Sequence, residues 1–378
     1  MKTRNTRHTR LRRTVIALAS SATAVSLTAC GVVDGIGGSD AKASPTKGDD
    51  IKVGLLLPEK ANSRYEKFDY PIIKEQVAEL TNNKGQVVYA NAEQNAKKQL
   101  TQLQQMVDDK VDVLLVDAVD SKSIATGVQK AKDAGIPVIA YDRLAQGPID
   151  AYISFDNELV GEVQGKALLD ALGPDASSKK IVMMNGAVTD PNAAQFKAGA
   201  LTELADKVVI AEKYDTEEWD PVNAKANMEK AIAAIGLNNI AGVYSANDGL
   251  AGAVIDVMKT MGVSTVPPVT GQDAELDGVQ RIVRGEQYMS VYKSYPQEAT
   301  AAAEMAVAKV QGRSIEFDAL TRDKVDSPTN KKIPSQLVPV VALTKKNIQE
   351  TVIQDGIYTV KQICTTDNKA ACTEIGLK

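Results

Sequence analysis

From Ile51 onward, short runs of hydrophobic residues alternate with longer segments in which hydrophobic residues recur every three or four positions. Runs of roughly four to eight apolar residues predict buried strands, and the wider spacing predicts helices that cover them. The first predicted strands lie at 52–58, 86–90, 111–118, 137–142 and 151–156, with helices at 94–109 and 121–134. This alternation is typical of a parallel sheet with helices on both faces.

The same alternation then begins a second time. Strands are predicted at 180–186, 207–215, 240–248 and 267–273, and helices at 192–205, 222–235 and 249–261. Two doubly wound α/β units in one chain predict a cleft between them, with the ligand beyond the carboxyl ends of the strands.

The N-terminus has a different pattern. A basic stretch with six Lys or Arg residues precedes an apolar run of sixteen residues, Thr14 to Ala29. This run is shorter than the roughly 20 residues of a bilayer span, so a cleaved signal peptide at 1–29 is favoured over a transmembrane anchor. Residues 31–50 are rich in Gly, Ser, Asp and Lys, which predicts a flexible tether.

Removing residues 1–29 changes the chemistry that the chain can perform. Six basic residues and no acidic ones are lost, so the formal net charge goes from −4 to −10. An acidic surface argues against nucleic acid as a partner. The only histidine, His8, is also lost, which excludes histidine-based catalysis and histidine-ligated metals.

Two cysteines remain near the C-terminus, Cys364 and Cys372. In an exported protein they are expected to form a local disulfide, with two free thiols as the alternative.

Polar residues follow the predicted strands of both units: 59–64, Asp142, Arg143, Asp156, Asn157, Asp190, Asn192, Asn247, Asp248 and Asp273. Carboxylates, amides and guanidinium groups suit a ligand covered in hydroxyl groups, which both donate and accept hydrogen bonds. For each residue alone, capping a helix is an equally good interpretation. The glycine patterns of dinucleotide and nucleotide sites are absent from the sequence, so no cofactor is expected.

Several strings resemble a known family, and the resemblance covers roughly Lys52 to Asp355. They lie at 137–143 (PVIAYDR), 152–168, 245–255, 270–282 and 290–294 (SVYKS). They are similar to the type I periplasmic sugar-binding proteins of ATP-binding cassette (ABC) importers, above all their xylose and multiple-sugar branch. Leu27-Thr28-Ala29-Cys30 resembles the bacterial lipobox, in which the cysteine is diacylated and becomes the new N-terminus.

The resemblance implies two α/β domains joined by three hinge crossings. The first domain is expected at 51–155 plus 294–338, and the second at 156–293 plus 339–378. The implied protein is exported, anchored to the membrane by a lipid on Cys30 and monomeric. It closes around a monosaccharide, D-xylose or a related aldose, and delivers it to a permease driven by a separate ATPase.

The resemblance also implies a set of ligand-binding residues. Arg64 corresponds to a sugar-contacting arginine and Tyr65 to a neighbouring aromatic stacker. Asp142 and Arg143 match an Asp-Arg pair that binds sugar hydroxyls. The remaining matches are Asn192, Trp219, Asn247 and Asp273 in the second domain and Lys293 near the hinge. The loop at 58–63, Tyr65 and Pro191 depart from the family pattern, which leaves the identity of the sugar open.

Three other functions are associated with a similar two-domain core, similar polar residues or a similar closed surface. Sugar-responsive repressors share the two-domain core, but they carry a DNA-binding motif where this chain has a signal peptide and tether. A sugar-acting enzyme needs carboxylates that flank a glycosidic bond, whereas Asp142 and Asp248 adjoin Arg143 and Asn247. A sensor that docks a membrane receptor remains open, because receptor and permease would recognise the same closed surface.

Overall fold

The computed structural model describes residues 46–377. The predicted signal peptide, Cys30 and most of the tether lie outside the described residues. The first part of the chain, together with residues 323–338, forms a seven-stranded sheet with the order β10-β11-β5-β4-β3-β1-β2. Its strands are β1 (Lys52–Leu57), β2 (Gln86–Asn91), β3 (Val113–Val116), β4 (Val138–Tyr141), β5 (Ala151–Phe155), β10 (Asp323–Val325) and β11 (Ile333–Val338). All neighbours are parallel except β10 and β11.

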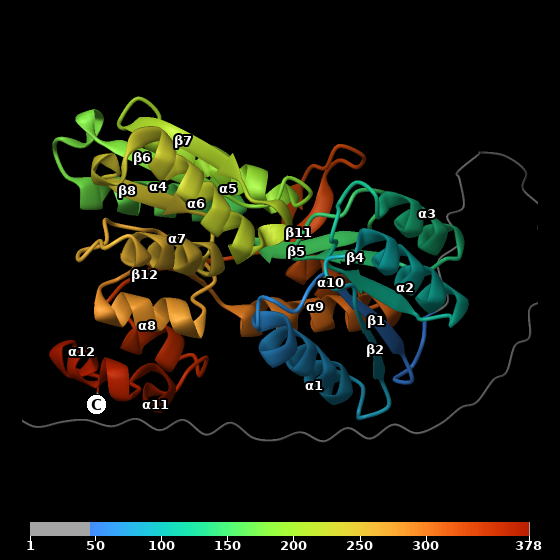
Figure 1. The fold of residues 1–378 in the computed structure, drawn as a ribbon. Coiled ribbons are helices and arrows are strands. Elements are labelled where there is room, and N and C mark those ends of the chain that lie inside the picture. Colours follow the sequence, from blue (N-terminus) through green and yellow to red (C-terminus); the bar gives the residue numbers. More distant parts are fainter. Residues whose placement is uncertain (1–45, 378) are drawn as a thin grey trace, which may run out of the picture. The chain divides into compact units, whose positions relative to one another are not determined.

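Helices cover both faces of this sheet (Figure 1). Alternate residues of β1 point to opposite faces, so Leu55 packs in the cluster under α1 and α9, and Leu56 in the cluster under α2 and α3. The helices are α1 (Tyr70–Leu80), α2 (Ala96–Asp108), α3 (Ala125–Asp133), α9 (Tyr295–Val310) and α10 (Ser314–Leu320), and the π-helix η1 (Tyr65–Asp69) precedes α1. We call this sheet with its helices the first lobe.

The second lobe contains a parallel sheet of β7 (Val209–Asp215), β6 (Lys180–Asn185) and β8 (Gly242–Ser245). An antiparallel pair, β9 (Ser290–Lys293) and β12 (Val340–Leu343), extends it. Its helices are α4 (Asn157–Leu172), α5 (Pro191–Leu204), α6 (Pro221–Ile235), α7 (Asp248–Thr260) and α8 (Leu276–Arg284), with short turns η2 (Ala176–Ser178), η3 (Glu217–Trp219) and η4 (Leu237–Asn239).

The predicted strand at 267–273 does not form a regular strand. Only Val269 makes an isolated bridge, to Val243, and further backbone bonds join this segment to β9, such as Asp273 N to Val291 O at 2.9 Å. Pro267 and Pro268 lack the N–H groups that a ladder requires, which explains the irregularity.

The chain passes between the lobes at three places: between β5 and α4, between β9 and α9, and between β11 and β12. In the second lobe α4 and α5 pack unusually closely. A Cβ on Gly161 would lie 2.0 Å from the Phe196 oxygen, and one on Gly199 would lie 1.9 Å from the Glu158 oxygen. Only glycine permits this approach, which fixes the position of α5 and of the residues at its start.

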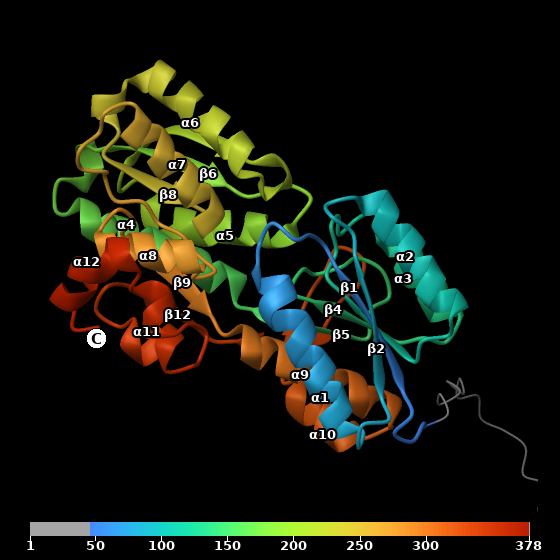
Figure 2. The ribbon, with the colours of Figure 1, turned by 60° about the horizontal axis from the view of Figure 1, so that its bottom comes forward.

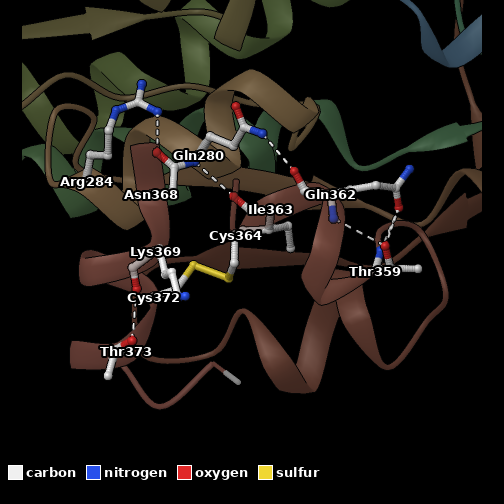
Figure 3. The surroundings of a disulfide bond; sticks show 10 residues. All are labelled: Gln280, Arg284, Thr359, Gln362, Ile363, Cys364, Asn368, Lys369, Cys372 and Thr373. Atoms are coloured by element: carbon white, nitrogen blue, oxygen red, sulfur yellow. Dashed lines mark hydrogen bonds between the residues drawn. A yellow bond between two sulfur atoms is a disulfide. The ribbon is translucent and has the colours of Figure 1, made fainter. Parts of the chain in front are cut away.

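The C-terminal segment packs beside α8 (Figures 1 and 2) and comprises η5 (Gln349–Ile353), α11 (Val360–Ile363), η6 (Thr366–Asn368) and α12 (Lys369–Glu374). A disulfide joins Cys364 and Cys372 (Figure 3). Arg284 of α8 donates to Asn368 Oδ1 at 2.8 Å and ties the segment to the helix that follows the loop carrying Asp273.

Candidate functional site

A cavity of about 140 Å³ lies between loops of the two lobes. The loops after β1 and β4 supply one wall, and the loops after β6, β7 and β8, the segment before α8 and the end of β9 supply the other. The nine residues predicted to bind ligand all line this cavity: Arg64, Tyr65, Asp142, Arg143, Asn192, Trp219, Asn247, Asp273 and Lys293. At roughly 30 Å³ per water in the liquid, this volume accommodates about five water molecules, which fits a small polar ligand.

Arg64 is buried and bound by three carboxylates. It donates to Asp69 twice, at 2.8 and 3.0 Å, to Asp142 Oδ2 at 2.7 Å and to Glu298 Oε2 at 2.6 Å. Its guanidinium carbon also lies 4.2 Å from the centre of the Tyr295 ring. These four bonds leave one of its five N–H groups free, so Arg64 orients Asp142 and offers at most one bond to a ligand.

Asp142 is held as an anion in the cavity wall. Burial alone would raise the pKa of this carboxyl, but the positive charges of Arg64, Lys293 and Arg143 outweigh burial and lower the pKa. Asn192 Nδ2, from the other lobe, lies 3.2 Å from Asp142 Oδ1 and donates to it. The carboxylate is therefore an oriented, charged acceptor.

Asp142 is an anion surrounded by cations, and Arg143 is a buried cation that lies between two carboxylates. Its Nε lies 3.0 Å from Asp190 Oδ2, across the cavity, and 3.5 Å from Asp117 Oδ1, behind it. Asp117 is fully buried, and burial raises the pKa of its carboxyl well above the usual range despite Arg143.

Asp190 is a cavity residue that the predicted set of nine omitted. Its Oδ1 accepts from Asn192 N at 2.9 Å, which caps α5, and its Oδ2 accepts from Trp219 Nε1 at 3.1 Å. The sequence signal was present, because an aspartate before Pro191 at a strand end is typical of an N-cap. The same carboxylate performs both roles.

Asn247 likewise caps a helix and lines the cavity. Its Oδ1 accepts from Leu250 N at 2.9 Å at the start of α7. The cap uses the amide oxygen, so the amide nitrogen is left as a donor. The two interpretations that the sequence left open, capping and ligand contact, are compatible in one side chain.

Asp273 and Lys293 form a buried pair, with Oδ1 and Nζ 2.7 Å apart. Burial would lower the pKa of Lys293, but the charges of Asp273 and Asp142 raise it. Asn62 of the first lobe donates to Asp273 Oδ2 at 3.1 Å and so bridges the two walls.

Trp219 supplies the aromatic part of the wall. Its ring packs on Gly186, where a Cβ would lie 2.1 Å from the ring, and edge-on to Phe196 at 6.3 Å between centroids. Tyr65 is buried beside Arg64. Aromatic rings of this kind cover apolar C–H faces of a ligand.

Three of the nine residues have left-handed backbone conformations: Asp142 (φ 55°), Trp219 (φ 56°) and Asp273 (φ 86°). Such conformations are costly for residues other than glycine and concentrate at ligand-binding sites.

Glu59 and Gln272 also line the cavity and were not among the nine residues. Burial raises the pKa of Glu59, whose carboxylate accepts from Asn62 N at 2.9 and 3.1 Å. In the cavity wall, the buried acceptors Gln272 Oε1 and Asn192 Oδ1 have neither a hydrogen-bond nor an ion-pair partner within residues 46–377, whereas Asp273 Oδ1 has only its ion pair with Lys293. Since both residues line the cavity, these two atoms can accept hydrogen bonds from a ligand that donates them.

Within residues 46–377, no group of His, Cys, Asp or Glu residues is arranged to hold a metal ion. In the same range no helix is long and apolar enough to cross a membrane. The cavity offers acceptors, cationic donors and the aromatic rings of Tyr65, Phe196 and Trp219, which are the groups that bind a neutral polyhydroxy ligand.

Comparison with known proteins gives one consistent result. The sequence profile of the family described as "Periplasmic binding protein domain" matches residues 53–314. The D-xylose-binding periplasmic protein of Escherichia coli K12 is 35% identical over 315 residues, which cover 82% of this chain and 91% of the relative. The multiple sugar-binding periplasmic receptor ChvE of Rhizobium radiobacter is 32% identical over 331 residues and covers 82% and 92%.

Solved structures have the same architecture. An ABC transporter solute binding protein from Clostridium phytofermentans, solved with bound β-D-glucose, superposes with a TM-score of 0.76 at 26% identity. The match covers 82% of this chain and 99% of that structure.

Proposed function

The chain belongs to the periplasmic binding proteins, and we propose that it captures a single monosaccharide, D-xylose or a related aldose, between its two lobes. The predicted family and the predicted type I fold of two α/β units are confirmed. The prediction that the chain is a binding protein and not an enzyme is also confirmed by the family to which it belongs.

The observation that carries the proposal is the set of buried, unsatisfied acceptors in a wall of oriented charges. Gln272 Oε1 and Asn192 Oδ1 lack partners among the described residues, and the anion Asp142 lines the same cavity. Sugar hydroxyl groups donate to such atoms, and the cations Arg143 and Lys293 donate to hydroxyl or ring oxygens.

The nine predicted residues, together with Asp190, Glu59 and Gln272, are proposed to form the sugar site. The proposed domains are 51–155 plus 294–338 and 156–293 plus 339–378, which meet at the three crossings. Sugar binds while the cleft is open, and its hydroxyl groups then bridge Asp142 and Arg143 to Asn247 and Asp273, so that closure is stabilised by bonds to both lobes.

The proposed partner of the closed form is an ABC permease with a separate ATPase. We further propose that the mature chain begins at Cys30, that this residue is diacylated and anchors the protein to the extracytoplasmic face of the cell membrane, and that the protein acts as a monomer. Two chains give stable anchoring where one is marginal, so Cys30→Ala should move the exported protein from the membrane fraction to the soluble fraction. Unchanged membrane association would contradict the anchor.

A calorimetric screen tests the sugar-binding function. Titration with D-xylose, L-arabinose, D-glucose, D-galactose and D-ribose should give saturable binding of at least one sugar to one site, and the sugar should be recovered chemically unchanged. A protein that binds none of them, or that converts the sugar, contradicts the proposal.

A further inference from the structure

We propose that Gln94, a residue outside the cavity, is a positioning residue that holds the Trp219 loop from the opposite lobe when the lobes are closed. This inference rests on the proposed sugar-binding function. Its basis is one hydrogen bond: Gln94 Nε2, on the first lobe, donates to the backbone oxygen of Glu218, on the second lobe, at 3.1 Å. Gln94 itself does not line the cavity.

On its own lobe Gln94 belongs to a corner that is firmly attached to the cavity loop. Gln94 N donates to Pro58 O at 2.8 Å, and Glu93 N donates to Asn91 Oδ1 at 2.9 Å. Asn91 Nδ2 in turn donates to Glu59 O at 2.8 Å. The side chain of Gln94 therefore projects from a fixed platform, so holding it in place costs less conformational entropy.

On the second lobe, the hydrogen bond from Gln94 is accepted by a segment whose backbone conformation is strained. Glu218 and Trp219 are consecutive and both left-handed, with φ of 57° and 56°. Neither residue is glycine, so this conformation persists only where surrounding contacts hold it. The Gln94 bond is one such contact, and it acts on the peptide that joins these two residues.

The ring of Trp219 is already fixed on its other sides. Gly186 and Phe196 pack against the ring, and Asp190 accepts from its Nε1. A shift of the Glu218 carbonyl would move the backbone of Trp219 against these contacts. Gln94 therefore braces the loop that carries this aromatic wall from the opposite lobe, while the contacts within the second lobe keep the ring itself in place.

Three pairs of side chains that bridge the lobes also line the cavity: Asn62 with Asp273, Arg143 with Asp190, and Asn192 with Asp142. Gln94 does not line the cavity, and neither does Tyr295 of α9, whose hydroxyl group donates to the Asp273 backbone oxygen. Removing the Gln94 amide therefore weakens closure and leaves the surface that faces the sugar unchanged.

The test is Gln94→Ala, measured by calorimetry and stopped-flow dissociation with every sugar that the wild type binds. We expect affinity to fall by about three- to tenfold, the worth of one exposed hydrogen bond, mainly through faster dissociation. The factor should be the same for each sugar, because the residue touches none of them. Gln129→Ala removes a comparable amide bond, to Asp133 on the exposed face of α3, and should bind as the wild type does.

A second variant reports on the bond itself. Gln94→Glu places a carboxylate against the carbonyl of Glu218 and should bind more weakly than Gln94→Ala at pH 7. Below a pH of about 4, near the usual pKa of a glutamate, the protonated group donates again, and its affinity relative to the wild type should recover.

Wild-type affinity in Gln94→Ala, a loss that differs from sugar to sugar, or a Gln94→Glu ratio independent of pH overturns the inference while leaving sugar binding intact. A wild type that binds no sugar overturns both proposals.

Discussion

Arg143 of the first lobe and Asp190 of the second face each other across the cavity as an ion pair, with Nε and Oδ2 3.0 Å apart. Both side chains are almost fully buried. A buried charge pair is favourable only where further hydrogen bonds satisfy its atoms, and Asp190 obtains these from Asn192 N and Trp219 Nε1. This pair therefore joins the helix cap, the aromatic wall and the opposite lobe at one carboxylate.

Asp190→Asn tests that junction. The amide oxygen can still cap α5, but the charge that faces Arg143 is lost, so sugar affinity should fall by about ten- to a hundredfold while thermal stability changes little. Asp215→Asn is the matched control, because Asp215 pairs with Lys197 at 3.1 Å on the exposed surface, where ion pairs contribute little. Equal calorimetric affinities for the two variants would contradict a role for Asp190 in the site.

Asn247 should lose two separable functions on substitution. Asn247→Ala removes the cap of α7 and should lower the free energy of unfolding by about 1 kcal/mol as well as the sugar affinity. Asn247→Ser retains a capping oxygen, so stability should return while affinity stays low. Affinity that recovers together with stability would show that the residue acts only as a cap.

Asp273→Ala should weaken sugar binding by about ten- to a hundredfold, and by more than Asn247→Ala does, because it also leaves Lys293 without its partner. Calorimetry, with circular dichroism to verify the fold, gives both results. An intact fold with full affinity contradicts the assignment of Asp273 to the site.

The position of the site could be predicted from the sequence, because the carboxyl ends of parallel strands lie at one edge of a sheet and ligands bind beyond that edge. Asp142, Asn247 and Asp273 could be predicted from their positions after apolar runs and from the resemblance of the strings around them. The double use of Asp190 could not, since a cap and a ligand-binding carboxylate have the same sequence pattern. Nor could the saturation of Arg64, because Glu298, one of its three partners, lies 234 positions away and pairs with it only through the packing of α9.

Among the helices and strands, too, some could be predicted from the sequence and others could not. Helices with a clear apolar period, such as α6 and α7, lie within one or two residues of their predicted bounds. The segment at 267–273 was predicted as a strand from its apolar residues, but the two prolines reduce it to a bridge. The strands β10 and β12 are short and half exposed, and β11 mixes three buried with three half-buried residues without regular alternation, so their pattern carries little periodic signal.

Asp248 should make stability depend on pH. Burial raises the pKa of this carboxyl to about 7. Between pH 4 and pH 7 the folded protein keeps a proton that the unfolded chain releases, so this group lowers stability as the pH rises through that range.

Asp248→Asn removes this contribution, so the melting temperature of the variant should fall less than that of the wild type between pH 4 and pH 7.5. Other titrating groups are common to both proteins and cancel in the difference. Asp256→Asn, on the exposed side of the same helix, should follow the wild type. Parallel melting curves for Asp248→Asn and the wild type would contradict the raised pKa.

The disulfide should contribute to stability and not to binding. It closes a loop between residues eight positions apart, for which chain entropy gives about 2 to 3 kcal/mol. The double variant Cys364→Ser, Cys372→Ser should unfold at a lower temperature and retain the affinity of the wild type for sugar. Alkylation of both thiols in the unreduced exported protein would show that the bond does not form.

The central claim, that a sugar is enclosed between the two lobes, is tested most directly by the emission of Trp219, the only tryptophan in the chain. Its ring lies in the cavity wall and is half buried. Titration with a sugar that binds by calorimetry should shift this emission to saturation at one sugar per chain, with the calorimetric Kd and with reduced quenching by iodide. A sugar that binds by calorimetry yet leaves both the emission and its quenching unchanged would contradict enclosure at this cavity.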